Sequence, residues 1–140
     1  MEGNRFDQEF IDLFLDSEVY AVVGVSTNKQ KYGYKVYESL KAAGYTVYAV
    51  NPRFEEICGE RCYPDLDSLP RRPDVVEFVC PPSVTEETVK ALPGLGVEMV
   101  WMQPGAESDE AVSFCRRNGI KALHDICVMV EMRKRPGADR

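Results

Sequence analysis

Residues 19–33 read VYAVVGVSTNKQKYG, and this stretch decides the fold. The apolar run at 19–25 shows no alternation of apolar and polar residues, which is typical of a strand buried on both faces. The segment 24–33 begins and ends with glycine and leads into an amphipathic helix expected at 33–43. That helix should end at Gly44, because glycine most easily adopts the left-handed conformation that closes a helix. The stretch therefore predicts a strand, a loop and a helix in succession.

The same alternation of helix and strand continues on both sides of this unit. Before it, aromatic and leucine side chains at helical spacing predict a helix at 6–16. After it, apolar runs predict strands at 45–50, 74–79, 97–102 and 120–124. Further helices are expected at 83–92, where Ser83 and Glu86 have capping-box spacing, and from Ser108 to about residue 118. The pattern predicts a doubly wound, Rossmann-like α/β fold with a five-stranded parallel sheet and helices on both faces.

One domain spanning residues 1–140 is expected, because a length of 140 residues is close to the typical size of a single domain. Between the second and third strands, at 51–73, we expect a loop with a short turn near 65–69. The final residues, 132–140, carry several arginines and a lysine, which predict a solvated basic tail.

Composition and charge exclude several classes of function. The net charge is −6, from 17 basic and 23 acidic residues, so the protein would repel a nucleic-acid backbone. No apolar run approaches the ~18 residues that a membrane-spanning helix needs, and the acidic N-terminus does not resemble a secretory signal. We therefore expect a cytoplasmic protein whose five cysteines are reduced. Cys58 and Cys62 are closely spaced, but His124 is the sole histidine, which argues against a zinc site.

The ligand of such a sheet binds outside the carboxyl ends of the strands, where the strand order reverses. The loop 24–33 follows the first strand, so its backbone N–H groups and the helix that it enters favour a phosphate group. Ser26 would donate a hydrogen bond to that phosphate, and Lys31 would balance its charge. The alternative is that the glycines only permit a tight strand-to-helix turn.

The end of the second strand distinguishes among nucleotides. NAD sites usually place an acidic residue there to bind the ribose hydroxyls, but this chain has Asn51, Pro52 and Arg53. Arginine suits a phosphorylated ribose, as in NADP or in coenzyme A (CoA) with its 3′-phosphate, unless Arg53 is only a solvated loop cation. A phosphoacceptor receiver domain is excluded, because 80–82 stand where it needs an aspartate, and the lysines after the first strand fit a flavodoxin poorly.

Six short motifs follow one another along the chain. They are GVS at 24–26, GY-x-VY-x-VNP at 44–52, CYP at 62–64, PDVV at 73–76, PP at 81–82 and W-x-QPGA at 101–106. In this order they resemble the motifs of the small stand-alone CoA-binding domain proteins, a family similar in fold to the CoA-binding domain of the succinyl-CoA synthetase alpha subunit. The resemblance covers roughly residues 18–131, and the ordered set is more specific than any single motif.

The resemblance implies contacts with CoA at several strand ends. The phosphates would be held by Gly24, Val25, Ser26, Lys31, Tyr32 and Gly33; the adenosine and its 3′-phosphate would be bordered by Asn51, Pro52 and Arg53; the nucleotide and pantetheine arm would be flanked by Cys80, Pro81 and Pro82. Two positions depart from the family pattern. Ile126 stands where an arginine often precedes Cys127, and Cys80 stands where an aliphatic residue is expected.

The end of the fourth strand adds Gln103 as a polar candidate at the same edge, whereas Trp101 is expected to lie in the core. His124 stands beside Asp125 and is expected to be a hydrogen-bonded structural residue, and no catalytic pattern of residues is evident. We therefore expect non-catalytic binding of CoA or an acyl-CoA. The alternatives are a subunit of an NADP-dependent oxidoreductase and a structural or interaction subunit whose nucleotide site has lapsed.

A cysteine at the carboxyl ends of the strands could react with the thiol of CoA. Cys80 ends the third strand, so its thiol would form a mixed disulfide with CoA under oxidising conditions, which would make the protein redox-sensitive. Cys58, Cys62 and Cys127 compete for this role, and the alternative for Cys80 is a small buried residue that never reacts.

Overall fold

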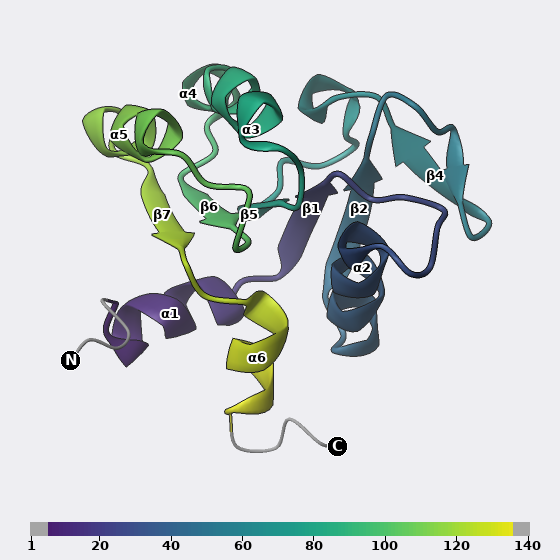
Figure 1. Ribbon diagram of the computed structural model, residues 1–140, viewed down its shortest axis with the longest axis horizontal. Coiled ribbons are helices and arrows are strands. Elements are labelled where there is room, and N and C mark those ends of the chain that lie inside the picture. The colour runs from purple at the N-terminus through teal and green to yellow at the C-terminus, as the bar shows by residue number, and fades with distance from the viewer. Residues whose placement is uncertain (1–5, 136–140) are drawn as a thin grey trace.

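The computed structural model describes residues 6–135, which form one sheet with helices on each side (Figure 1). The strands are β1 (Val19–Val23), β2 (Thr46–Val50), β3 (Glu56–Ile57), β4 (Glu60–Tyr63), β5 (Val75–Phe78), β6 (Met99–Met102) and β7 (Lys121–His124). The helices are α1 (Gln8–Leu15), α2 (Tyr32–Ala42), α3 (Pro82–Val89), α4 (Leu92–Leu95), α5 (Asp109–Arg117) and α6 (Val128–Arg133), with a 3₁₀ turn at Leu66–Ser68.

The strand order is β3-β4-β2-β1-β5-β6-β7, and all neighbours are parallel except β3 and β4. From β1 the chain first moves to β2 on one side and later returns to β5 on the other side. The order therefore reverses between β1 and β5, whose carboxyl ends lie next to each other. In sheets of this type, ligands bind at that position.

Two hydrophobic layers cover the two faces of the sheet. On β1, Tyr20 and Val22 join the layer that packs against α1, α2 and α6, whereas Ala21 and Val23 join the layer against α3, α4 and α5. Figure 1 shows these two sets of helices on opposite sides of the sheet. Because β1 is buried on both faces, its apolar run lacks alternation, and the expected mostly parallel α/β fold is confirmed.

The expected number of five strands is wrong, because the sheet has seven. The additional pair, β3 and β4, forms a short hairpin in the segment expected to be a loop, and Cys58 and Gly59 make its turn with positive φ angles of 51° and 82°. Only Ile57 and Cys62 of this hairpin are buried. A strand of two residues with one buried side chain has no periodicity to detect, which is why the pattern missed it.

Helix boundaries agree with side-chain capping at two of the expected starts. The Asp7 side chain accepts a hydrogen bond from the Phe10 N–H at the start of α1, and Ser108 accepts one from the Ala111 N–H at the start of α5. The capping box expected at Ser83 does not form. Helix α3 instead begins at Pro82, since the fixed φ of proline and its missing N–H suit the first helical position.

The end of the chain also differs from expectation. The basic tail was expected to begin near residue 132, but α6 continues to Arg133, and the tail beyond Arg135 lies outside the described residues. Helix α6 was missed because it is only six residues long and follows an irregular segment. Within residues 6–135, no helix combines the length and the apolar character needed to cross a membrane.

Candidate functional site

The loop after β1 is held against its neighbours by two glycines. Gly24 has a φ of +109°, and a Cβ atom on it would lie 2.1 Å from the carbonyl oxygen of Val79, in the loop after β5. A Cβ atom on Gly33, in the first turn of α2, would lie 2.3 Å from the carbonyl oxygen of Gly24. The glycines therefore allow close packing of β1, β5 and α2 at the point where the strand order reverses.

Local hydrogen bonds shape the loop between these glycines. The Ser26 hydroxyl oxygen accepts a hydrogen bond of 3.0 Å from the Asn28 N–H, and the Asn28 side chain accepts one of 2.9 Å from the Gln30 N–H. Such side-chain turns are typical of serine and asparagine. This hydrogen bond does not use the Ser26 hydroxyl proton, and its donation to a ligand stays a prediction.

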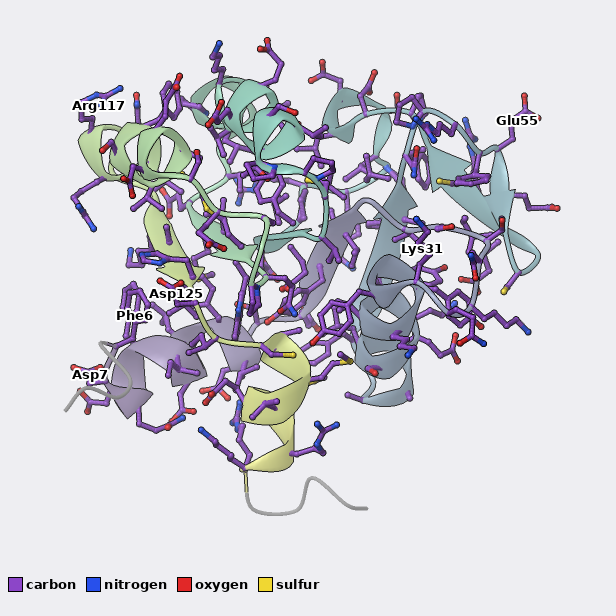
Figure 2. All side chains as sticks on the ribbon, in the orientation of Figure 1. Phe6, Asp7, Lys31, Glu55, Arg117 and Asp125 are labelled. Carbon is purple, nitrogen blue, oxygen red and sulfur yellow. The ribbon has the colours of Figure 1, made fainter. Side chains whose placement is uncertain are left out.

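Helix α2 begins without a side-chain cap. Its N-cap residue is Lys31, which makes no capping hydrogen bond, since lysine has no acceptor atom. Lys29, Lys31 and Lys35 are all exposed around this end of the helix, and Figure 2 shows Lys31 beside the first turn of α2. Backbone donors, the helix dipole and lysine charges thus act together, an arrangement that stabilises phosphate groups.

Asn51 connects the end of β2 to the same loop. Its side-chain N–H donates a 2.8 Å hydrogen bond to the carbonyl oxygen of Val25, and its side-chain oxygen accepts one of 2.9 Å from the Arg53 N–H. Val25 is buried, so it reaches this edge only through its backbone. Pro52 and Arg53 are exposed beside it. The structure therefore brings the residues of the first two strand ends together, as the sequence predicts.

The loop after β5 contributes Cys80, Pro81 and Pro82. Pro81 and Pro82 are exposed at the start of α3, while Cys80 is half-buried with its Sγ 3.3 Å from Thr85 Oγ1. Burial raises the pKa of the Cys80 thiol, although the Thr85 hydrogen bond acts in the opposite direction. The Cys80 thiol is therefore disfavoured as a thiolate.

Gln103 is buried, although its place after the fourth expected strand predicts a polar side chain at the ligand-binding edge. It is 1% exposed, its Oε1 accepts a 2.8 Å hydrogen bond from the Val128 N–H, and its Nε2 donates to Cys127 Sγ at 3.4 Å. In this arrangement Gln103 positions the start of α6, and its contact with a ligand stays a prediction. Trp101 lies in the core as expected, and its indole N–H donates to the Ile126 carbonyl oxygen.

The structure adds one functional candidate, Glu77, and gives more weight to Cys127, which the sequence offers only as a thiol competing with Cys80. Cys127, the N-cap of α6, lies 3.1 Å from the Tyr32 hydroxyl. Glu77 is fully buried in β5, and neither of its carboxyl oxygens has a hydrogen-bond partner among the described residues. The signal for Cys127 was its place just after the last strand, and the signal for Glu77 was an acid within an apolar run.

His124 and the other cysteines take structural positions. His124 Nδ1 lies 2.6 Å from Asp125 Oδ2, so the expectation of a hydrogen-bonded structural histidine is confirmed. Cys58 is exposed in the β3–β4 turn, whereas Cys62 and Cys115 are buried. Within the part of the chain that the structure describes, no group of three or more histidine, cysteine or acidic residues is arranged to hold a metal ion.

Two surface cavities lie away from these strand ends. One of about 590 Å³ is bordered by α1, α5 and β7, and it includes Phe10, Val112 and Ile120. Another of about 850 Å³ lies among α1, α2 and α6, near Gly44 and Met129. Neither is lined by a residue that the sequence places in contact with a ligand.

Comparisons with known proteins identify relatives of this chain. ADP-forming acetate–CoA ligase I of Archaeoglobus fulgidus is 30% identical over 121 residues, which are 79% of this chain and 18% of the ligase. The uncharacterized protein YneT of Bacillus subtilis is 25% identical over 134 residues, covering 91% of this chain and 94% of that protein. This chain therefore spans less than a fifth of the ligase but nearly the whole length of YneT.

A solved structure and a family model also match this chain over most of its length. A hypothetical protein from Pyrococcus horikoshii superimposes with a TM-score of 0.88 at 29% sequence identity, over 96% of this chain and 98% of that chain. The family model described as a CoA binding domain matches residues 18–133, nearly the range over which the motifs were recognised. The resemblance inferred from the motifs is thus confirmed, and this chain belongs to the CoA binding domain family.

Proposed function

We propose that the protein binds CoA or an acyl-CoA, without catalysing a reaction on it, at the carboxyl ends of β1, β2, β5 and β6. The observation that carries the proposal is the close packing around Gly24 and Gly33, which places the uncapped start of α2 at the point where the strand order reverses. Exposed lysines surround that helix end, and this combination suits the pyrophosphate of CoA.

The adenosine end of CoA is assigned to the end of β2. Asn51 holds the backbone of Arg53 in a turn, and Arg53 itself is exposed beside the loop that follows β1. Its guanidinium group would pair with the 3′-phosphate, which distinguishes CoA from dephospho-CoA. Across the edge of the sheet, Pro81, Pro82 and Cys80 would flank the nucleotide and the start of the pantetheine arm.

A binding role without catalysis agrees with the state of the chain's histidine. His124 is buried and engaged with Asp125, so it is poorly placed to receive a group from a ligand. The name of the related ligase states that it joins acetate to CoA, and this chain corresponds to less than a fifth of that enzyme. We extend to this chain only the binding of CoA.

Arg53→Ala is expected to weaken the binding of CoA more than that of dephospho-CoA. The expected difference is about 1.5–3 kcal/mol, the typical contribution of a hydrogen bond between charged groups. Isothermal titration calorimetry with both ligands measures it. Arg116→Ala, which changes an exposed arginine on α5, serves as the control and should leave both affinities unchanged. Equal losses for the two ligands in Arg53→Ala would mean that Arg53 does not contact the 3′-phosphate.

A subunit of an NADP-dependent oxidoreductase remains the alternative that Arg53 also favours, because NADP carries a phosphate on its ribose. A structural subunit with a lapsed site is the other alternative, and it predicts that neither nucleotide binds. Direct comparison of CoA with NADP separates all three.

A further inference from the structure

Cys127 lies between two hydrogen-bonding side chains that come from different parts of the chain. Its Sγ is 3.1 Å from the hydroxyl of Tyr32, the first residue of α2, and 3.4 Å from Nε2 of Gln103, just after β6. A thiolate accepts hydrogen bonds from such groups better than a thiol does.

The electrostatics agree with this geometry. Burial by itself would raise the pKa of the Cys127 thiol, but the hydrogen bonds with Tyr32 and Gln103 lower it below its ordinary value. In contrast, burial raises the pKa values of the thiols of Cys62, Cys80 and Cys115. Cys127 is half-buried, and the neighbouring Tyr32 is 45% exposed, so a ligand has access to this sulfur.

Glu77 provides an independent sign that this place is built for a polar ligand. It extends from β5 toward the layer that contains α6, is 0% exposed, and has no partner for either carboxyl oxygen within residues 6–135. Its register partner on β6 is Trp101, whose indole donates to the residue before Cys127. Burial and the charge of Cys127 raise the pKa of Glu77, which favours the protonated form of this carboxyl. A buried, protonated carboxyl without an acceptor is an unused hydrogen-bond donor.

The position of Cys127 fits the far end of an extended CoA molecule. Arg53 follows β2, whereas Gln103 and Cys127 follow β6 and β7. The order β2-β1-β5-β6 separates these ends by three strand spacings, which is about 14 Å. With its phosphates at the start of α2, an extended pantetheine arm that crosses this edge brings its sulfur toward Cys127.

We propose that Cys127, rather than Cys80, is the reactive thiol of the protein and that it exchanges with the disulfide of oxidised CoA, an inference that rests on the proposed binding of CoA. The Cys127 thiolate attacks one sulfur of CoA disulfide. A bond forms between Cys127 Sγ and that pantetheine sulfur, the original S–S bond breaks, and the departing CoA thiolate takes a proton from water. Cys127 is oxidised as one CoA is reduced, and the protein retains the other CoA covalently.

Intact-mass spectrometry after incubation with CoA disulfide at neutral pH tests this exchange. The expected product carries one CoA, is reversed by dithiothreitol and does not form in Cys127→Ser. Cys58→Ser, which removes the exposed thiol of the β3–β4 turn, should form the adduct as the wild type does. An adduct that survives Cys127→Ser, or one that Cys80→Ser abolishes, would overturn the assignment.

Tyr32→Phe tests the thiolate without removing the sulfur. Loss of the hydroxyl donor should raise the pKa of Cys127 and slow its exchange with CoA disulfide by about 10-fold at neutral pH. The pH profile of Cys127 alkylation by iodoacetamide should move to higher pH in parallel. An unchanged profile and rate would show that the Tyr32 hydroxyl does not stabilise the thiolate, contrary to the proposal.

Two further measurements separate this inference from the proposed function. Reversible binding of CoA by the wild-type protein in the presence of reductant tests the proposed function alone, and binding without any adduct would overturn only the exchange. Glutathione disulfide serves as the comparison oxidant. If CoA does not bind reversibly and glutathione disulfide modifies Cys127 as fast as CoA disulfide does, the thiol is reactive but the recognition of CoA is wrong.

Discussion

Replacing Gly24 with alanine is expected to lower the free energy of unfolding by about 3–5 kcal/mol, a large part of the stability of a typical domain. Two penalties combine at this position. The φ of +109° disfavours any residue with a side chain, and the new Cβ atom would lie 2.1 Å from the Val79 carbonyl oxygen. Neither the β1 loop nor the β5 loop can relieve the contact without moving its backbone, so CoA binding should be lost as well.

Gly44→Ala is the matched control for this substitution. Gly44 has a nearly identical φ of +102°, but a Cβ atom there would meet nothing within 4 Å. It should therefore cost only about 1–2 kcal/mol, the strain of a left-handed residue. Chemical denaturation of both variants measures the difference, and CoA titration reports on the loop. Equal destabilisation of the two variants would mean that the loops separate easily and that their close packing does not define the site.

A second large effect is expected from the buried Glu77 carboxyl, which should make the protein less stable as pH rises. Burial and the charge of Cys127 raise the pKa of Glu77, so the folded protein holds a proton that the unfolded chain releases. For an acid whose pKa is higher in the folded state, stability is unaffected by pH below the pKa of the unfolded chain. Stability then falls as pH rises from that pKa to the pKa of the folded protein. The free energy of unfolding should fall by about 1.4 kcal/mol per pH unit in that interval.

Glu77→Gln removes this titration while keeping the size of the side chain. Relative to the wild type, the variant should gain stability steadily as pH rises above the range in which an ordinary glutamate ionises, with nearly the slope given above. Denaturant unfolding of both proteins at several pH values measures the difference. Glu55→Gln, which changes an exposed carboxyl before β3, should leave the wild-type slope intact. A constant difference between Glu77→Gln and wild type would mean that Glu77 ionises normally.

The sequence predicts the strands and helices that are long enough to show a recognisable pattern of apolar residues. The run at Val19–Val23 and the parallel strands beside it are buried on both faces, so their apolar character identifies them. The hairpin of β3 and β4 and the six-residue helix α6 are too short for a period, and both form because longer elements offer them a surface. For example, Tyr37 on α2 donates a hydrogen bond to Glu60 on β4.

The part of the candidate site that could be predicted from the sequence consists of residues that follow strands. Gly24, Ser26, Lys31 and Asn51 follow strands, and parallel strands end at one edge of a sheet. Whether such a side chain is buried or exposed could not be predicted from its place after a strand. Gln103 follows a strand too, yet it turns inward to position α6 and to donate to Cys127. The partnerless Glu77 depends on packing between layers, which no local pattern encodes.

Titration calorimetry of the reduced protein with CoA, NADP and NAD tests the central claim most directly. The loop after β1 and the arginine after β2 suit a phosphorylated nucleotide, and membership of the CoA binding domain family favours CoA among such nucleotides. The account predicts that CoA binds at a single site, about tenfold or more tighter than NADP or NAD, a difference of about 1.4 kcal/mol or more. Tighter binding of NADP than of CoA, or no binding of CoA, would contradict it.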